Sequence, residues 1–232
     1  MFLVFIKTKA LKVAFLALVL TSTIMRGESL AAILARMDRS AVEFHSVTAR
    51  MKRVDYTEVV DDKSDSEGVM SLMRTKTGAV TLVQFESPEP RSVYISDHSV
   101  QVYYPKANTV EIYDTAKFTS RTDQFLLLGF GTTTAELNKA YELKALGMET
   151  VAGVAATRIE LTPKSAEMKK LFTKIELWVP EGQDKPIQEK VTEPSKNYIQ
   201  VTYSDMKVNL RLPASFYELK LPAGVRKVFP QK

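Results

Sequence analysis

Apolar residues along the chain follow two different periods, and the change between them separates a predicted helix from predicted strands. Between residues 29 and 44 they recur every three or four positions, with charged residues on the other faces. This spacing is typical of an amphipathic helix, and Ser29 is placed to act as its N-cap. From Val47 onward the period is two, which is the spacing of half-buried strands.

Most of the remaining chain alternates between apolar and polar residues in short segments. The parity of the alternation shifts near Arg53, which predicts a bulge or bend in the first strand. Residues 61–68 (DDKSDSEG) form a predicted acidic turn, and further alternating segments follow it. Residues 122–140, a predicted loop with one or two short helices, and residues 165–172, a predicted short helix, interrupt the pattern. The sequence therefore predicts a mainly β protein built on an antiparallel meander.

Residues 96–114 (SDHSVQVYYPKANTVEIYD) predict a hairpin in which each strand carries one apolar face. The residues that we place on this face are Val100, Val102, Tyr104, Val110 and Ile112. A one-residue error in register would bring other residues there instead, namely Gln101, Tyr103 and Tyr113. The alternation leaves two interpretations open: the face packs against the rest of the chain, or it lines a binding site.

The first 27 residues have the layout of a secretory signal peptide. Lys7, Lys9 and Lys12 precede an apolar run at residues 13–20, and small or polar residues follow. The run is too short for a typical transmembrane helix. We expect residues 1–27 to be removed on export and residues 28–232 to form a single domain; an uncleaved anchor is the alternative.

The net charge of +5 comes largely from this N-terminal segment. Residues 1–27 hold four basic residues and no acidic one, so 28 basic and 27 acidic residues remain in the rest of the chain. This near-neutral balance removes the main support for nucleic-acid binding, and we expect no nucleic-acid partner. The sequence has no cysteine, which excludes disulfides, thiol chemistry and the acylated cysteine of a bacterial lipoprotein.

Motifs for catalysis or metal binding are not evident in the sequence. The two histidines, His45 and His98, belong to no metal or triad pattern. Residues 129–134 (GFGTTT) lack the GK[ST] of a phosphate-binding loop. We expect no enzymatic activity, no metal and no cofactor. An exported hydrolase on a β scaffold and an anchored envelope scaffold are the alternatives from other classes.

Arg74 is a charged residue on a strand face that is otherwise apolar. It follows Met70 and Leu72 at strand spacing, so its guanidinium faces inward if those two side chains do. A buried guanidinium needs acceptors such as backbone carbonyls or a carboxylate. The alternative is that the strand ends near Arg74 and the side chain reaches solvent.

A nearly unbroken apolar run lies beside two glycines in the predicted loop. Its members are Phe125, Leu126, Leu127, Leu128 and Phe130. Two interpretations are open. The run is either a core helix that is covered on every side, or a lid over a cavity that Gly129 and Gly131 allow to move.

Several motifs occur in a fixed order along the chain. GxMxLxR spans residues 68–74, the hairpin motif follows, LTPK spans residues 161–164, and the tail carries Asn209, Pro213, Phe216, Pro222, Gly224 and Val225. In this order and spacing, the chain resembles the LolA-type periplasmic carriers of outer-membrane lipoproteins. Thr75 and His98 depart from the family pattern, which has a proline and a glycine at those positions.

The resemblance implies a strongly curved antiparallel sheet that forms an incomplete β-barrel. An N-terminal helix and short helices would cover its concave face, and the cavity between them would hold acyl chains. Candidate cavity residues are Met70, Leu72, Val93, Ile95, Val100, Val102, Tyr104, Val110 and Ile112, and candidate lid residues are Phe125, Leu126, Leu127, Leu128 and Phe130. By its place after Gly68, Arg74 matches the family arginine that hydrogen-bonds the lid as a latch.

The resemblance also implies a function and a location. It implies a periplasmic chaperone, expected to be a monomer, that shuttles acylated lipoproteins from the inner to the outer membrane. Its partners would be an inner-membrane lipoprotein-releasing transporter and an outer-membrane acceptor. The two departures from the family pattern leave the cargo open, so a carrier or sensor of another lipid or glycolipid is the alternative.

Overall fold

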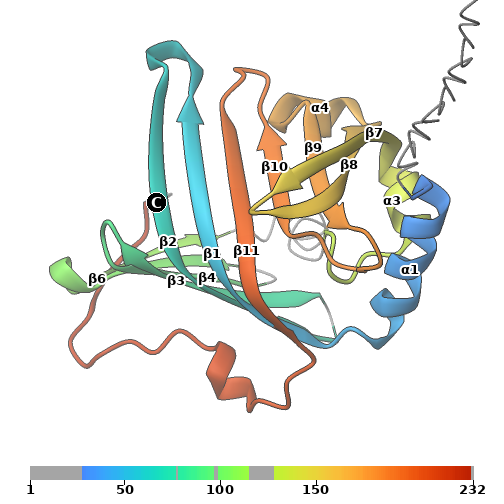
Figure 1. Cartoon of the computed structure of the whole chain (residues 1–232). Coiled ribbons are helices and arrows are strands. Elements are labelled where there is room, and N and C mark those ends of the chain that lie inside the picture. The colour runs from blue at the N-terminus through green and yellow to red at the C-terminus, as the bar shows by residue number, and fades with distance from the viewer. Residues whose placement is uncertain (1–27, 77, 97–98, 115–127, 231–232) are drawn as a thin grey trace, which may run out of the picture.

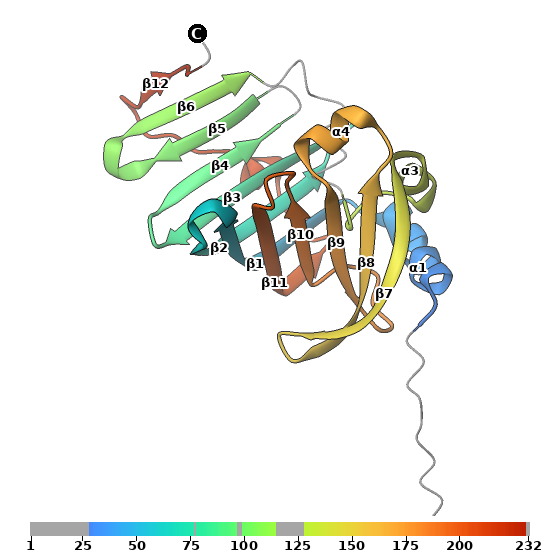
Figure 2. The same ribbon diagram turned by 90° about the horizontal axis from the view of Figure 1, so that it is seen from above.

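The computed structural model of the chain describes residues 28–76, 78–96, 99–114 and 128–230. The predicted signal peptide, His98 and three of the candidate lid residues, Phe125, Leu126 and Leu127, lie outside these ranges. Within the described ranges, twelve strands form one sheet in the order β12-β6-β5-β4-β3-β2-β1-β11-β10-β9-β8-β7. Figures 1 and 2 show that this sheet curves strongly and that its two edges do not meet. The predicted fold class, a mainly β incomplete barrel, is confirmed.

Most of the strands follow one another along the chain with short connections, but longer segments separate β6 from β7 and β11 from β12. Their bounds are β1 (Ser46–Thr57), β2 (Asp62–Arg74), β3 (Ala79–Ser87), β4 (Arg91–Ile95), β5 (Ser99–Tyr104), β6 (Thr109–Asp114), β7 (Tyr141–Val151), β8 (Val154–Pro163), β9 (Lys174–Pro180), β10 (Gln188–Thr192), β11 (Tyr198–Val208) and β12 (Arg226–Val228). Neighbouring strands are antiparallel, except that β12 runs parallel to β6.

Helices occupy the ends of the sheet and the connections between strands. The α-helices are α1 (Leu30–Glu43), α3 (Thr134–Ala140) and α4 (Ala166–Leu171), and 3-10 turns lie at Glu58–Val60, Pro105–Ala107 and Ala214–Tyr217. Ser29 caps α1 by accepting a hydrogen bond from the Ala32 amide, and Ser165 caps α4 in the same way. The cap at Ser29 and both helices agree with the sequence prediction.

Two local predictions about the first hairpin are wrong. Residues 61–68 are not a turn, because β2 begins at Asp62 and pairs with β1 from there. The turn lies earlier, at Glu58–Val60, where Asp61 adopts the left-handed conformation with φ 47°. Polar residues fit this part of β2 because most of them are exposed. The bulge expected near Arg53 is also wrong, because β1 pairs with β2 in unbroken register, and its register with β11 shifts earlier, between Thr48 and Arg50.

The concave face of the sheet is divided into two apolar clusters. In the filled half, side chains of α1 and α3 pack onto β7, β8 and β9; its buried members are Ile33, Met37, Leu128, Leu137, Tyr141, Ile159, Leu161, Phe172, Ile175, Leu177 and Val179. In the hollow half, the cluster consists of Phe44, Val47, Ala49, Met51, Met70, Leu72, Phe85, Phe130 and Tyr203. α1 and α3 lie beside β7 and β8 in Figure 1, at one end of the curved sheet.

Candidate functional site

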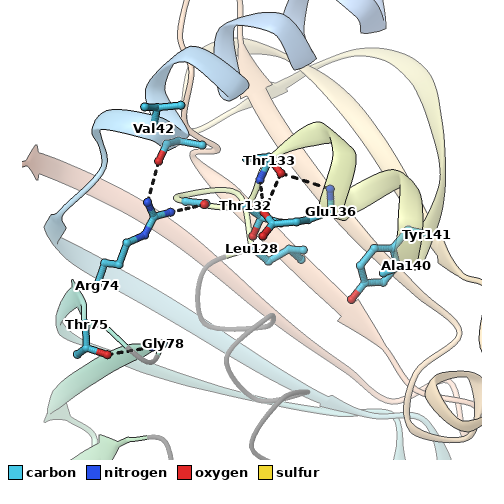
Figure 3. A pocket seen from close by; sticks show the side chains of 12 residues that line it. Val42, Arg74, Thr75, Gly78, Leu128, Thr132, Thr133, Glu136, Ala140 and Tyr141 are labelled. Atoms are coloured by element: carbon cyan, nitrogen blue, oxygen red, sulfur yellow. Dashed lines mark hydrogen bonds between the residues drawn. The ribbon is translucent and has the colours of Figure 1, made fainter.

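Arg74 ends β2 and joins three segments of the chain that are far apart in sequence. Its Nη1 donates a hydrogen bond of 2.9 Å to the backbone oxygen of Ala41, in the last turn of α1. Its Nη2 donates to the backbone oxygen of Gly131, in the loop before α3. Figure 3 shows the guanidinium pointing between these two segments. The side chain therefore faces inward, as the alternation with Met70 and Leu72 predicts, and does not extend into solvent.

Aromatic packing and a glycine support this contact. The guanidinium lies 5.6 Å from the centre of the Phe44 ring, a distance at which a cation attracts a ring face. A Cβ atom on Gly131 would collide with the Arg74 Nη2 and would lie 2.9 Å from the Phe44 ring. Position 131 therefore needs glycine because the loop backbone approaches Arg74 closely. The role of Arg74 as a latch stays a prediction.

A pocket lies beside the Arg74 contact, between the ends of α1, β2 and α3. Its volume is about 400 Å³, and Val42, Leu128 and Tyr141 contribute apolar surface to it. Val42, at its edge, is 76% exposed, which is unusual for an apolar side chain at the end of an amphipathic helix. A capping box holds the start of α3: the Thr133 hydroxyl accepts a hydrogen bond from the Glu136 amide, and the Glu136 carboxylate accepts one from the Thr133 amide (Figure 3).

A second, apolar cavity of about 290 Å³ lies on the concave face of the hollow half. Its lining residues come from β1 to β4, β10, β11 and the loop before α3; they are Met51, Arg53, Met70, Leu72, Thr81, Val83, Phe85, Val93, Ile95, Phe130, Glu189, Val201 and Tyr203. Nine of these thirteen side chains are hydrocarbon, thioether or phenyl groups. The cavity can therefore bury an apolar ligand, but four polar side chains also face it.

Four of the candidate cavity residues line this cavity: Met70, Leu72, Val93 and Ile95. On β5, Val100 pairs with Ile95 and Val102 pairs with Val93, so both share the cavity face. Tyr104, two residues further, lies on the same face and is exposed. The β5 part of the predicted hairpin face thus extends the concave wall beyond the cavity itself.

On β6, the other strand of the hairpin, the predicted apolar face points away from the cavity. Val110 pairs with Tyr103 and Ile112 pairs with Gln101, so Val110 and Ile112 lie on the convex side, contrary to the prediction. The cause is the connection: a 3-10 turn and Asn108, with φ 43°, bring Tyr104 opposite Thr109. This register places Glu111 and Tyr113 on the concave side instead.

Two of the candidate lid residues lie in the described ranges, and they connect the two halves. Leu128 is buried in the filled half, and Phe130 is buried in the hollow half, where it lines the cavity. The Phe130 ring lies edge-on to Tyr203, with 5.4 Å between centres, and 6.4 Å from Phe44. The loop before α3 therefore covers part of the cavity, which fits both the core and the lid interpretation.

Glu189 is a cavity residue that the sequence analysis missed. It pairs with Leu177 on one side and Val201 on the other, so its side chain shares the concave face with theirs. The residue is half-buried, but its Oε1 is fully enclosed. Burial raises the pKa of Glu189 to about 8, and a hydrogen bond with Tyr203 partly opposes this. Val191, two residues on, is the sequence signal that places position 189 on an apolar strand face.

Arg53 is a second missed residue, and its placement follows from the uninterrupted register of β1. It stays on the same face as Val47 and Met51, and it lines the cavity. Asp55, two residues on and on the same face, accepts hydrogen bonds of 2.8 Å and 2.6 Å from the Arg53 guanidinium. The positive charge at the cavity wall is therefore paired.

The described residues contain no group of three or more His, Asp or Glu side chains arranged to hold a metal ion. Over the same ranges, none of the helices combines the length and the apolar character that a membrane span requires. The site is thus built from an apolar cavity, four polar side chains and the Arg74 contact.

The described residues form an unclosed, curved sheet whose apolar concave face is partly covered, which is the architecture of a protein that binds apolar ligands. The chain belongs to the outer membrane lipoprotein carrier protein LolA family, whose model matches residues 47–220. This confirms the family resemblance read from the motifs. Among curated proteins, no sequence matches the chain significantly.

Solved structures align with most of the chain at low sequence identity. An uncharacterized conserved protein from Thermus thermophilus aligns with a TM-score of 0.51 and 13% identity, over 87% of this chain and 99% of that chain. The lipoprotein LppX of Mycobacterium tuberculosis aligns with a TM-score of 0.47 and 14% identity, over 80% and 99% of the two chains. A LolA superfamily protein from Nitrosomonas europaea aligns with a TM-score of 0.39 and 13% identity, over 83% and 98%.

Proposed function

We propose that this protein is a periplasmic carrier that binds the acyl chains of lipoproteins on its concave face and shuttles them from the inner to the outer membrane. The observation that carries the proposal is the Arg74 contact. One guanidinium hydrogen-bonds the end of α1 and the loop before α3, next to an apolar cavity that the same loop covers. Family membership supports the proposal.

The strength of the hydrophobic effect explains why such a carrier needs a polar contact that can open. A buried methylene contributes about 0.8 kcal/mol, so full capture of a chain of about fifteen methylenes would contribute about 12 kcal/mol. Cargo held so tightly would not be released. Hydrogen bonds that exist only in the empty state lower the net affinity, because they are lost when acyl chains enter. The Arg74 contact has this property if it opens on loading.

The substitution Arg74→Leu tests the proposal. It removes both hydrogen bonds to the covering segments, so the open form should gain population and lipopeptide should be released at least about tenfold more slowly, which corresponds to about 1.4 kcal/mol. The measurement is transfer of a labelled triacyl lipopeptide from the purified protein to acceptor vesicles. Arg50→Leu is the matched control, because Arg50 is an exposed arginine that pairs with Glu86 on the convex face. Identical release by the Arg74 variant and wild type would contradict the latch role.

Acyl specificity is tested separately. The protein without residues 1–27 should bind a hydrophobic fluorophore that lipopeptide displaces and deacylated lipopeptide does not. Equal displacement by the two peptides would contradict the carrier function.

Two further measurements test the form of the exported protein. Its intact mass would show whether cleavage occurs after residue 27, and sedimentation would test the proposed monomer.

The proposal includes partners and excludes catalysis. An inner-membrane lipoprotein-releasing transporter would load the protein, and an outer-membrane acceptor would unload it. A carrier or sensor of another lipid or glycolipid is the second candidate, and the polar side chains in the cavity lining favour it. Mass spectrometry of lipids and lipopeptides that copurify from the native envelope separates the two candidates.

A further inference from the structure

Two residues that line the apolar cavity each carry a buried polar atom without a partner in the described part of the chain. Among the described residues, neither Glu189 Oε1 nor Thr81 Oγ1 has a hydrogen-bond partner, and both residues line the cavity. An unsatisfied buried polar atom destabilises the folded protein, because it has lost its hydrogen bonds to water and gained none in return. A cavity for plain hydrocarbon chains would be more stable and bind more tightly without them. Their presence therefore indicates a ligand that brings a polar atom into the cavity.

The two atoms come from opposite walls of the cavity. Glu189 lies on β10, and Thr81 lies on β3, four strands away in the order of the sheet. Thr81 is 3% exposed and sits between Leu72 and Ile95, with which it pairs on the neighbouring strands. A chain that enters between the walls would pass both oxygens. Each wall otherwise offers it mainly apolar contacts.

The charge states of the polar side chains in the lining determine which polar group of a ligand the cavity can accommodate. At pH 7 the Glu189 carboxyl is mostly neutral, because burial raises its pKa to about 8, so it can donate one hydrogen bond and accept others. The Thr81 hydroxyl can also donate and accept. The Arg53 guanidinium faces the same cavity but is paired with Asp55, and burial raises the pKa of the Tyr203 phenol well above its ordinary value, so it is neutral too. A cation or an anion on the ligand would find no free opposite charge among the described residues of this lining.

We infer that the cavity selects acyl ligands that carry an uncharged oxygen, either a hydroxyl on the chain or an ester, and that Glu189 and Thr81 hydrogen-bond this oxygen. The inference rests on the proposed acyl-chain carrier function and adds a ligand preference to it. It also explains why a glutamate occupies the apolar face beside Leu177, where a leucine would pack without cost. Tyr203 positions the carboxyl through their hydrogen bond.

Competition between matched ligands at pH 7 tests the inference. The protein is loaded with a hydrophobic fluorophore and titrated with two pairs: octadecanoic acid against 12-hydroxyoctadecanoic acid, and an ether-linked dialkylglycerol against the ester-linked diacylglycerol of equal chain length. One good hydrogen bond contributes about 1 kcal/mol, so in at least one pair the 12-hydroxy acid or the ester-linked lipid should bind about fivefold more tightly than its partner. The pair that shows the preference identifies the source of the oxygen.

Three variants assign the preference to these side chains. Thr81→Val keeps the shape and removes the hydroxyl, and Glu189→Leu removes the carboxyl; each should bring the affinity ratio within the preferred pair close to one. Glu189→Gln keeps the hydrogen-bonding capacity and should keep most of the ratio. Thr202→Val is the control, because Thr202 lies on the convex side and bonds Gln188.

Each result has a distinct meaning. Equal affinity of wild type for both members of both pairs would overturn the inference, and so would a ratio that survives in Thr81→Val and Glu189→Leu. Displacement of the fluorophore by none of the four ligands would instead contradict the carrier function itself. Circular dichroism of each variant confirms that the compared proteins are folded.

Discussion

The two halves of the concave face use the same sheet for different purposes. In the filled half, α1 and α3 supply side chains that cover β7 to β9, and partly buried residues such as Leu34 and Leu143 lie at the edge of the cluster. In the hollow half, no α-helix lies on β2 to β5 within the described ranges, and Val83, Val93 and Val201 at the edge of the cluster stay partly exposed. Strands of both halves carry apolar side chains on the concave face. Within the described residues, the halves differ in whether α-helices pack onto the concave face. This helical cover decides whether an apolar strand face becomes core or cavity.

The boundary between the halves runs between paired residues on β9 and β10. Leu177 belongs to the filled half and is 1% exposed, while Glu189, directly opposite on the next strand, faces the cavity. The loop before α3 crosses this boundary, with Leu128 on one side and Phe130 on the other. Because Arg74 holds the same loop, the contact that we propose as a latch also sets how much of the hollow half is covered.

Truncating one buried side chain in each half should reveal the difference in packing between the halves most strongly. Leu177→Ala removes a fully packed side chain and should destabilise the protein by about 2–5 kcal/mol. Met70→Ala enlarges a space that already exists, so some of its contacts are already missing and the loss should be smaller, below about 2 kcal/mol. Urea unfolding followed by circular dichroism measures both values. Equal losses at the two positions would show that the hollow half is packed as tightly as the filled half.

The pH dependence of stability should differ between wild type and Glu189→Gln. The folded-state pKa of Glu189 is raised to about 8 from an ordinary value of 4.5, so above pH 4.5 the folded protein keeps a proton that the unfolded chain has lost. Wild type should therefore lose stability as pH rises from about 4.5 to about 8 and show no further loss from this group above that. Glu189→Gln lacks this loss. At about pH 9 its free energy of unfolding should therefore exceed that of wild type by on the order of 1–3 kcal/mol.

Unfolding free energies of both proteins at about pH 5, 7 and 9 check this prediction. Arg53 and Tyr203 are the other ionisable groups that face Glu189 from β1 and β11, and both are unchanged in the variant, so the difference between the curves isolates the carboxyl. Parallel curves would mean that solvent reaches Glu189 and that the hollow half is wetter than its lining indicates.

The sequence predicts the sheet well because the sheet follows from local alternation, whereas for Arg74 the alternation left an inward and a solvent-exposed side chain open and the family resemblance favoured the inward one. Met70, Leu72 and Arg74 share a face whatever lies around them, and the capped helices at Ser29 and Ser165 need only local signals. Turns and charged positions are harder to predict. An acidic segment at residues 61–68 resembles a turn, yet it pairs as a strand since its side chains reach solvent.

Cavity residues depend on register and on long-range pairing, which the alternation does not contain. Val110 and Ile112 face the convex side because a four-residue connection sets the pairing of Tyr104 with Thr109. Glu189 and Thr81 lie four strands apart in the sheet, and only the curvature turns both toward one space. No local pattern marks such a pair, although a glutamate two residues before Val191 on a strand is a signal worth following.

Gly131→Ala should loosen the cover of the hollow half without changing Arg74. The added Cβ would collide with the Arg74 guanidinium and the Phe44 ring, so the loop must shift and the hydrogen bond to Gly131 weakens. We expect a loss of about 1–2 kcal/mol in stability and slower release of lipopeptide, as in Arg74→Leu. Gly224→Ala is the control for backbone strain, because φ is 73° there and open space surrounds the position. Gly224→Ala should lower the free energy of unfolding and leave the release rate unchanged. Equal release rates for wild type, Gly131→Ala and Gly224→Ala would contradict the latch.

The smallest effect is expected at an apolar site that belongs to neither half. Val59 lies in the turn at the tip of the β1–β2 hairpin and is 89% exposed, so its side chain contributes almost no burial. Val59→Ser should change the free energy of unfolding by less than about 0.5 kcal/mol and leave fluorophore binding as in wild type. Urea unfolding and the same binding assay measure both. A clear loss of binding would show that the apolar surface used by the ligand extends to this tip, and the division of the concave face into a filled and a hollow half would then omit part of the site.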